Sequence, residues 1–516
     1  MSTPRPHRPS TLQALFCTAL AAGLVGCTVG PDYKRPSTAA PADWTRWRSG
    51  DASLRSIAVS DNPLPADWWR GFGDPVLDEL ERRAFEASPD LQTAALRFVQ
   101  ARVQRGDAAA AGLPQVNVSG GVSRQRQSEY GASTRLFDAL GNSQAGLDRD
   151  QIAKLLGEPY ELYQGGFDAS WEIDLWGKVR RSLEAADASV AEQAALLDQA
   201  RLSIASDLAQ AYFDLRATQC RIAITRDDIG ALGERIEIMT ARTQGGINDH
   251  FDLERQRTEL QAAEAQLPSL IAQEAAQTNR IALLLGQTPG TLTDLLKPQT
   301  ENRIAALPDL ALGLPSEIAL RRPDIRAAEA RLHSATANIG VAEADLYPSI
   351  RLGGSFNLES YKAGNLFDWA SRSYSIGPTI DLPLFDGGRR KRVVRLRELE
   401  QKEAAVAFQQ TVHKAWQEID DALNGYAAEQ QQNAKLVARR DSARQALDLA
   451  TARYEGGVIT WLEVLDSRRS YLHARRDLAE SDMRLGTRYV AVNKAIGNSP
   501  AVAGSNERAQ GEASAQ

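Results

Sequence analysis

The sequence predicts a mainly α-helical fold with a membrane β-barrel component, built from two tandem strand-and-helix repeats. Three observations support this fold class. The chain contains an internal duplication, four short segments alternate apolar and polar residues, and two stretches of about 65 residues contain no proline. Together these patterns favour long helices packed side by side, combined with a small number of two-faced strands.

Bulk composition excludes several classes of protein. The chain has 516 residues, a formal net charge of −6 and 43% hydrophobic residues. Its three cysteines are too few for a disulfide framework, and the mild acidic excess argues against nucleic acid as a main partner. Long runs rich in Ala, Gln, Glu, Leu and Arg, with only 6% aromatic residues, favour extended helices over a compact enzyme core.

The N-terminus has the features of a targeting segment. A basic start is followed by an apolar run from Leu12 to Val25, which is too short for an ordinary spanning helix and suits a secretory signal. The run ends in Leu24-Val25-Gly26-Cys27, which resembles the lipobox of bacterial lipoproteins. We therefore expect Cys27 to carry diacylglycerol and an N-acyl chain; the alternative is a chance cysteine after an ordinary signal peptide. Thr28, which is not Asp, implies sorting to the outer membrane.

Two alignments reveal the duplication. Residues 89–120 match 323–354 without a gap, at an offset of 234, and the matches include Gly106 with Gly340. Residues 241–286 match 452–497 at an offset of 211, so the first copy carries 23 additional residues, which we place in the polar stretch 125–160.

Each copy contributes two predicted strands. Val116, Val118 and Val122 alternate with polar residues, and the other three segments follow the same period of two. One face of every strand is apolar and the other is polar. The residues assigned to the polar face that carry charge are Asp168, Glu172, Asp174, Arg351 and Asp381.

Long helices complete each copy. The first helices are expected over roughly 76–111 and 316–346, and the proline-free stretches 178–243 and 389–455 would each make a rod of about 100 Å. Each rod ends at a Gly-Gly turn, and shorter helices return over 247–286 and 459–497, with a kink or break expected at Pro268. The predicted organisation begins with a lipoprotein signal peptide at 1–26 and a lipid-anchored extended segment at 27–75. Repeat 1 follows at 76–290, with strands at about 114–125 and 163–175, and a linker occupies 291–315. Repeat 2 covers 316–497, with strands at about 348–358 and 374–385, and a disordered tail covers 498–516.

The four strands point to a membrane barrel shared between chains. Strands of about ten residues with one apolar face suit a barrel wall, and only a closed barrel can span a bilayer with strands. Four strands cannot close a barrel alone, because the single-chain minimum is about eight. The alternative is a soluble α+β protein whose sheet covers one face with helices, which would show the same alternation.

Several motifs, in this order, resemble the TolC-like outer-membrane factor family, specifically its lipoprotein branch that serves tripartite RND-type efflux systems. The resemblance spans nearly the whole mature chain. The motifs are Cys27-Thr28-Val29-Gly30-Pro31-Asp32-Tyr33, Trp68-Trp69-x-x-Phe72-x-Asp74-Pro75, Arg321-Arg322-Pro323-Asp324, Ile339-Gly340-Val341-Ala342-x-Ala344-Asp345-Leu346-Tyr347-Pro348 and Leu382-Pro383-Leu384-Phe385-Asp386-Gly387-Gly388-Arg389.

The resemblance implies a homotrimer with a 12-stranded barrel in the outer membrane and a long α-helical barrel in the periplasm. It implies a passive, gated conduit that exports small molecules such as drugs and toxic compounds. Its partners would be a periplasmic adaptor (membrane fusion) protein and an inner-membrane pump. The alternative within the same fold is a channel for type I protein secretion.

The family's tunnel closes at its periplasmic tip, and the resemblance carries this gate to the segment after Gly457. Glu463 and Asp466 match the two acidic positions, and their spacing places them on one helix face. Leu462 would be an apolar constriction beside them, and Asp252 is the equivalent acid of the first copy. In a trimer each acid would form a ring of three carboxylates. The alternative is that these residues are ordinary solvated positions of an amphipathic helix.

The sequence contains no arrangement typical of an enzyme. It has no nucleophile elbow or phosphate-binding loop, and its histidines lack metal-ligand spacing. We therefore expect no catalytic residues, no metal and no cofactor apart from the lipid on Cys27. A purely periplasmic helical scaffold is a further alternative, but such a protein would not need four two-faced strands.

Overall fold

The computed structural model describes residues 28–37, 47–55, 65, 67–130, 149–245, 249–298, 310, 312, 318 and 321–500. Cys27, the predicted signal peptide, and residues 501–516 of the predicted tail lie outside this set. The described elements are α2 (Ala52–Arg55), η1 (Trp68–Phe72), α3 (Pro75–Ala87), α4 (Pro89–Ala110), β1 (Gln115–Gln125), α6 (Arg149–Leu156), β2 (Tyr160–Glu172), α7 (Lys178–Gln244), α8 (His250–Leu284), α10 (Pro323–Ala344), β3 (Ser349–Ser360), η2 (Ala363–Asn365), η3 (Trp369–Ser371), β4 (Arg372–Asp381), α11 (Arg389–Glu455) and α12 (Trp461–Ala495).

Contacts divide the chain into two compact units, and each unit takes segments from both sequence repeats. The sheet unit contains Val103–Asp187, His333–Lys402 and the described residues up to Tyr33. The helical unit contains Lys34–Arg102, Ala188–Leu332 and the chain from Glu403 onward. The repeats are therefore units of sequence, whereas the compact units are assembled across them.

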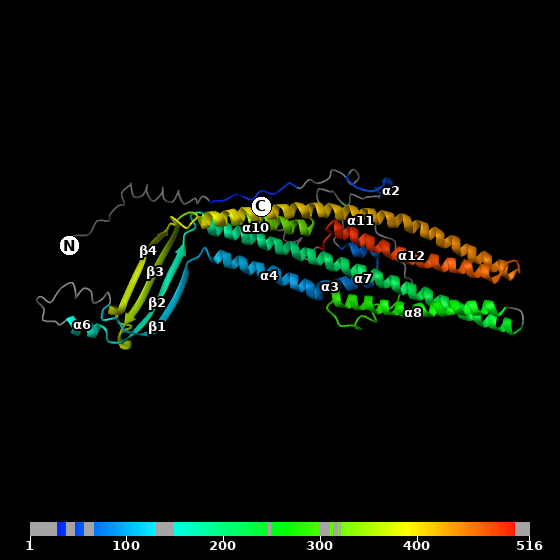
Figure 1. Cartoon of the computed structure of the whole chain (residues 1–516), viewed down its shortest axis with the longest axis horizontal. Helices are drawn as coiled ribbons and strands as arrows, with labels where there is room; N and C mark the ends of the chain where they lie inside the picture. Colours follow the sequence, from blue (N-terminus) through cyan, green and yellow to red (C-terminus); the bar gives the residue numbers. More distant parts are fainter. Residues whose placement is uncertain are drawn as a thin grey trace, which may run out of the picture. The chain divides into compact units, whose positions relative to one another are not determined.

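The sheet unit holds a four-stranded antiparallel sheet in the order β1-β2-β3-β4 (Figure 1). Its register aligns like faces across all four strands. Val118 lies opposite Phe167, Phe167 opposite Phe356, and Phe356 opposite Tyr374. The adjacent polar row is Asn117, Asp168, Ser355 and Ser375, in which Asn117 Nδ2 donates to Asp168 Oδ2 at 3.1 Å. One apolar and one polar face therefore run across the whole sheet.

The second and the last strand both begin and end earlier than predicted. The second strand begins at Tyr160 and ends at Glu172, so Asp174 is not on the polar face of the sheet. Its carboxylate instead accepts hydrogen bonds from the backbone N–H groups of Val179 and Arg180, at 3.1 and 3.0 Å, in the first turn of α7. The last strand ends at Asp381, before the Leu382–Phe385 stretch. The predicted C-terminal ends of both strands extend too far, because the alternating pattern continues into the connections to the long helices.

The connection between the two strands explains the unequal length of the repeats. It has 34 residues between β1 and β2 (126–159) and 11 between β3 and β4 (361–371), a difference of 23. The additional residues of the first copy therefore lie where the alignment placed them. This connection includes α6, which the sequence analysis did not predict.

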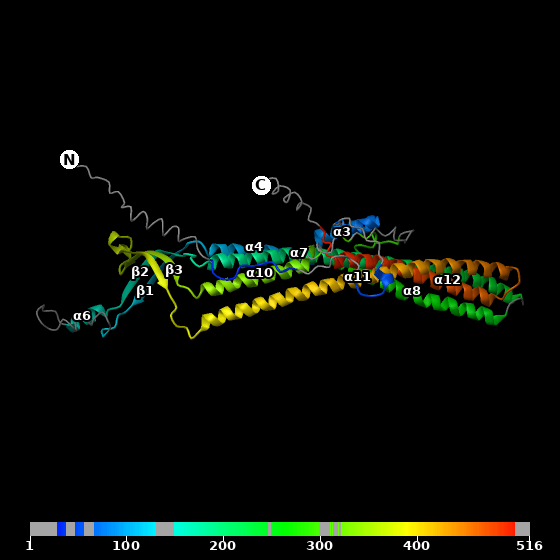
Figure 2. The same cartoon turned by 90° about the horizontal axis from the view of Figure 1, so that it is seen from above.

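The long helices α7 and α11 each span 67 residues, in agreement with the proline-free stretches. In the helical unit, α7 lies beside α8 and α11 beside α12 (Figures 1 and 2). An ion pair of 2.6 Å between Arg439 and Asp477 joins α11 to α12. Among the described helices, none has an apolar stretch long enough to cross a bilayer.

One helix prediction was wrong, and the break that was one alternative at Pro268 does not occur. The first predicted helix is two helices, because Ser88 leaves the helical region with ψ 124° just before Pro89. Conversely, α8 continues through Pro268 without a break. Pro268 lies on the exposed face, and so does Glu264, whose carbonyl loses its usual helical donor; water can therefore satisfy this carbonyl.

The main hydrophobic core lies in the helical unit and is built around aromatic residues. The ring centroid of Phe72 lies 4.9 Å from that of Phe213 and 5.2 Å from that of Tyr489. Asp74 caps α3 by accepting from Val76 N at 2.9 Å, and the Tyr212 hydroxyl donates to the same carboxylate. This packing explains the Trp-Trp-x-x-Phe-x-Asp-Pro motif, which positions α3 on the long helices.

Candidate functional site

Three of the predicted gate residues, Leu462, Glu463 and Asp466, lie in the first two turns of α12. The side chains of this segment separate sharply by exposure. Val464 is fully buried and Trp461 and Leu465 are each 6% exposed, whereas Leu462 is 46% exposed. Glu463 and Asp466 are also exposed. One face of the helix is therefore packed against the protein, and the face with Leu462, Glu463 and Asp466 is open.

A second hydrophobic cluster holds this end of α12 in place. Its buried members come from α7, α8, α11 and α12, and they are Met239, Leu253, Ala450, Trp461, Val464 and Leu465. The cluster joins the two helix pairs at the end where each pair turns back. The position of the acidic face is therefore set by a packed core rather than by a loop.

Trp461 is the central residue of this cluster. Its indole N–H donates to Gln256 Oε1 at 3.2 Å, inside the core. The guanidinium of Arg235 lies 3.6 Å from the centre of the Trp461 ring, and the ring centroid of Tyr454 lies 5.0 Å from that of Trp461 in an edge-to-face arrangement. Burial, together with the nearby charge of Arg468, lowers the pKa of Arg235 from its usual value. This cation–π contact stabilises a cation that is partly removed from water.

The two acidic side chains have no ion pair and no side-chain hydrogen bond within the described part of the chain. Glu463 forms hydrogen bonds through its backbone: its N–H donates to the Thr460 carbonyl oxygen at 3.2 Å, and its carbonyl oxygen accepts from the Ser467 hydroxyl at 2.9 Å. Elsewhere in the helical unit many exposed carboxylates are paired with arginine, as in Glu254 with Arg257. The charges of Glu463 and Asp466 are therefore available to solvent, to ions or to another chain.

Asp252, the predicted equivalent in the first copy, lies in the first turn of α8 and is half-buried. Helix α8 is capped by Asp249, whose carboxylate accepts from Phe251 N at 3.1 Å. Within the described residues of the single chain, Asp252 forms no hydrogen bond or ion pair with Glu463 or Asp466. The structure thus places all three acids near helix starts.

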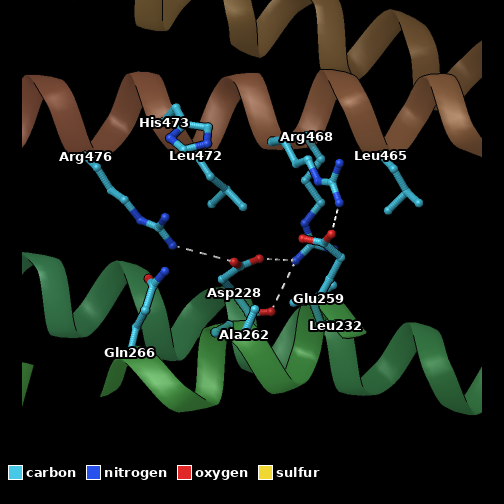
Figure 3. Close-up of a pocket in the computed structure, with 12 residues that line it drawn as sticks. Asp228, Leu232, Glu259, Ala262, Gln266, Leu465, Arg468, Leu472, His473 and Arg476 are labelled. Atoms are coloured by element: carbon cyan, nitrogen blue, oxygen red, sulfur yellow. Dashed lines mark hydrogen bonds and ion pairs between the residues drawn. The ribbon is translucent and has the colours of Figure 1, made fainter. Parts of the chain in front are cut away.

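An ion-pair network that the sequence analysis missed joins α12 to α7. Arg468 Nη2 donates to Asp228 Oδ1 at 2.9 Å and to the Asp228 carbonyl oxygen at 3.3 Å, and Arg476 lies 3.8 Å from the same carboxylate (Figure 3). The side chains of Asp228 and Arg468 are 8% and 12% exposed. We call this pair the α7–α12 latch. The two residues are 240 positions apart, so no local pattern in the sequence could have paired them.

The latch lines a small cleft of about 160 Å³ between α7, α8 and α12 (Figure 3). Arg469 forms a second ion pair across it with Glu259 of α8. Leu465, whose side chain also belongs to the tip cluster, lines the same cleft. The helix that carries the exposed acids is therefore held to the first helix pair by apolar packing on one turn and by ion pairs on the next.

Within the described residues, no group of His, Cys, Asp and Glu side chains is arranged to hold a metal ion. Cys220 is a free thiol on α7, and burial raises its pKa. A thiol that is protonated at neutral pH is a poor nucleophile, so this residue is best explained by packing.

Comparison with known proteins identifies the class to which this fold and site belong. The family model described as outer membrane efflux protein matches residues 80–287 and 314–498, which covers both repeats. The chain is 30% identical to outer membrane protein OprJ of Pseudomonas aeruginosa over 451 residues, which are 87% of this chain and 88% of that protein.

Two further comparisons agree. The chain is 28% identical to the toluene efflux pump outer membrane protein TtgF of Pseudomonas putida over 488 residues, which are 93% of this chain and 95% of that protein. The solved structure of the outer-membrane channel OprN matches with a TM-score of 0.78 at 31% identity, over 92% of this chain and 99% of that one.

The chain belongs to the outer membrane efflux protein family. It is an efflux channel protein of the outer membrane, and the predicted family, function and location are confirmed.

Proposed function

We propose that three copies of this chain form a passive, gated conduit that exports small molecules across the outer membrane. The sheet supports a shared barrel. In the described residues β1 and β4 each pair with a neighbour on one side only, so both sheet edges keep unpaired backbone groups. Three sheets joined edge to edge would close twelve strands, with the apolar face toward lipid and the polar face toward water.

The resting bore of this conduit is set at the helical tip. Trimer symmetry turns each exposed residue of the α12 open face into a ring of three. Glu463 and Asp466 would make two carboxylate rings that attract cations and narrow the bore, and Leu462 an apolar ring beside them. Asp252 adds an acid at the equivalent place of the first copy. The observation that carries this proposal is the absence of any partner for Glu463 and Asp466 within the described residues of a single chain.

The test of the gate is conductance of the purified trimer in planar bilayers. We expect Glu463→Ala with Asp466→Ala to raise single-channel conductance at least about twofold and to weaken cation selectivity, because both carboxylate rings are removed. A matched control is Glu264→Ala, which removes an exposed acid of α8 away from the tip. Unchanged conductance and selectivity in the double variant would contradict the gate.

The proposed conduit also implies its partners and its cargo. The conduit contains no energy source, so it requires an inner-membrane pump and a periplasmic adaptor that connects the pump to its tip. A relative named for toluene efflux supports small molecules as cargo over secreted proteins. We further propose that Cys27 carries diacylglycerol and an N-acyl chain, which would tether the N-terminus to the inner leaflet of the outer membrane.

A further inference from the structure

Residues 28–33, which directly follow Cys27, lie in a close-fitting site on the sheet unit. The backbone N–H of Val29 donates to the carbonyl oxygen of Trp176 at 3.1 Å. Trp176 follows β2, and its indole N–H donates to the Pro348 carbonyl just before β3, at 2.7 Å. The segment is therefore held at the end of the sheet from which the chain enters the long helices.

Glycines allow the two backbones to approach closely. Gly30 has φ +91°, and a Cβ built on it would lie 2.4 Å from the Cα of Gly340 on α10. A Cβ on Gly340 would lie 2.9 Å from the carbonyl oxygen of Val29, and one on Gly177 would lie 3.1 Å from Thr28 Cβ. Each of these distances is shorter than ordinary van der Waals contact, so a side chain at Gly30 or Gly340 would displace the segment.

A buried arginine binds the backbone of this segment. The side chain of Arg181 is only 5% exposed. It donates to the carbonyl oxygens of Val29 and Gly30, both at 3.2 Å, and forms ion pairs of 2.7 Å with Asp32 and with Glu184. Without residues 28–33 this cation would lose three of its four partners while remaining largely enclosed, which is unfavourable.

The far end of the segment is fixed by an aromatic contact. The ring of Tyr33 stacks on His333 of α10, with centroids 4.1 Å apart and planes within 14°. His333 Nε2 lies 2.9 Å from Glu184 Oε1, so the ring that receives Tyr33 is itself oriented by the acid that pairs with Arg181. Backbone, charge and ring contacts thus all converge on six residues.

The duplicated sequence provides an internal comparison. Gly106 of α4 occupies the place in the first repeat that Gly340 occupies in the second. A Cβ on Gly106 would meet no atom within 4 Å, whereas one on Gly340 would meet the N-terminal segment. The close approach at Gly340 is therefore due to the N-terminal segment and to the Arg181 side chain that binds it, 2.9 and 2.8 Å from such a Cβ, and not to the repeated helix.

We propose that Gly177, Arg181, Glu184, His333 and Gly340 form a docking site whose ligand is the chain's own mature N-terminus, residues 28–33. Docking places Thr28, the residue that follows Cys27 in the sequence, beside Gly177 at the start of α7. Where Cys27 is acylated, a point that rests on the proposed function, the site couples the lipid rigidly to the folded channel. Residues 28–33 are then bound to the folded chain and are not a flexible link between the lipid and the channel.

The test is limited trypsin digestion of the purified full-length protein in detergent, followed by mass spectrometry of the released N-terminal fragment. Cleavage after Lys34 requires residues 30–33 to leave the docking site and enter the protease. We expect Gly340→Ala and Gly30→Ala to accelerate this cleavage about tenfold or more, because the docked state is sterically excluded. Gly106→Ala is the matched control and should be cleaved at the rate of the unaltered protein.

Further variants separate docking from general misfolding. Arg181→Met should accelerate cleavage after Lys34 without increasing cleavage inside α7 or α11, and Arg181→Lys should restore part of the protection. Unaccelerated cleavage of both Gly340→Ala and Arg181→Met would overturn the docking site. The mass of the N-terminal fragment reports acylation of Cys27, and conductance of the same preparations reports the channel, so failure of either proposal is read separately from failure of docking.

Discussion

At the scale of single residues, the motifs that resemble the family are explained mainly by structure. Arg322 of the Arg-Arg-Pro-Asp motif is buried and donates to the carbonyl oxygen of Ala495. Burial alone would lower its pKa, but ion pairs of 2.6 Å with Asp324 and Glu418 outweigh this effect and raise it. Such residues fix helix ends and cores, whereas Leu462, Glu463 and Asp466, which are proposed to set the bore, are exposed.

The buried residue Glu81 makes the stability of the folded protein depend on pH. Glu81 of α3 is fully buried, and its two carboxylate oxygens have no hydrogen-bond partner in the described part of the chain. Burial, with a smaller contribution from Asp78, raises its pKa well above the usual 4.5. The folded state therefore keeps a proton that the unfolded state loses, and stability falls as pH rises above about 4.5 toward the folded pKa.

We expect Glu81→Gln to remove this pH dependence. Its gain in stability should be negligible near pH 4 and should grow with pH by up to about 1.4 kcal/mol per pH unit until the folded pKa is reached. Thermal unfolding of the detergent-purified protein from pH 2 to 9 measures this dependence. Glu79→Gln on the same helix is the control with the opposite sign. Hydrogen bonds from Arg82 and Arg83 lower the Glu79 pKa to about 2, so its contribution is present above pH 4.5 and lost as pH falls toward 2.

At the scale of elements, the position of α12 depends on both the tip cluster and the α7–α12 latch. The latch is nearly buried, and its loss would leave Arg468 and Arg476 facing each other without their shared acid. Removing one partner of a buried pair costs far more than removing one of an exposed pair. The latch should therefore hold the acidic rings at their resting radius.

We expect Asp228→Asn to destabilise the folded protein by about 3 kcal/mol and to raise single-channel conductance, because α12 is released from α7. The neighbouring Asp227 provides a matched control. Its side chain is 66% exposed and lies 3.6 Å from Arg475, so Asp227→Asn should cost less than about 1 kcal/mol and leave conductance unchanged. Equal effects of the two substitutions would show that burial of the latch is not what positions α12.

At the scale of the whole molecule, the sheet requires other chains. Four strands with two open edges cannot enclose a pore, and their apolar face is exposed in the single chain: Val118 is 85% exposed and Ile376 is 82% exposed. Apolar residues at this exposure in a regular row mark a surface made for lipid or for another chain.

We expect outer-membrane fractions to contain a species of about three times the chain mass that collapses to the monomer on boiling in SDS, because closed barrels resist the detergent until heated. A version with a conventional signal peptide and Cys27→Ser should still form this species, since the barrel itself holds the membrane. Only a monomeric band without boiling would contradict the shared barrel. Loss of the species in the Cys27→Ser version alone would show that acylation is needed for assembly.

The sequence by itself determined the elements and their order. Period-two alternation gave four strands, the absence of proline gave α7 and α11, and the duplication located the additional residues between β1 and β2. These features are local, or repeat at fixed spacing, so they can be read without coordinates. Local reading failed where context decides. Pro268 is tolerated because its face is exposed, and Asp174 caps a helix although it continues a strand pattern.

Only the tertiary structure decided which distant residues meet. Asp228 and Arg468 are joined across 240 positions because α7 packs beside α12. Arg181 binds Gly30 across 151 positions because the N-terminal segment lies against α7 and α10. The tertiary structure also distinguished positions that are equivalent in the sequence repeat. Gly106 and Gly340 match in the duplication, yet only Gly340 contacts another backbone. Periodicity specifies which face of an element is apolar, but the partner of that face depends on how the whole chain packs.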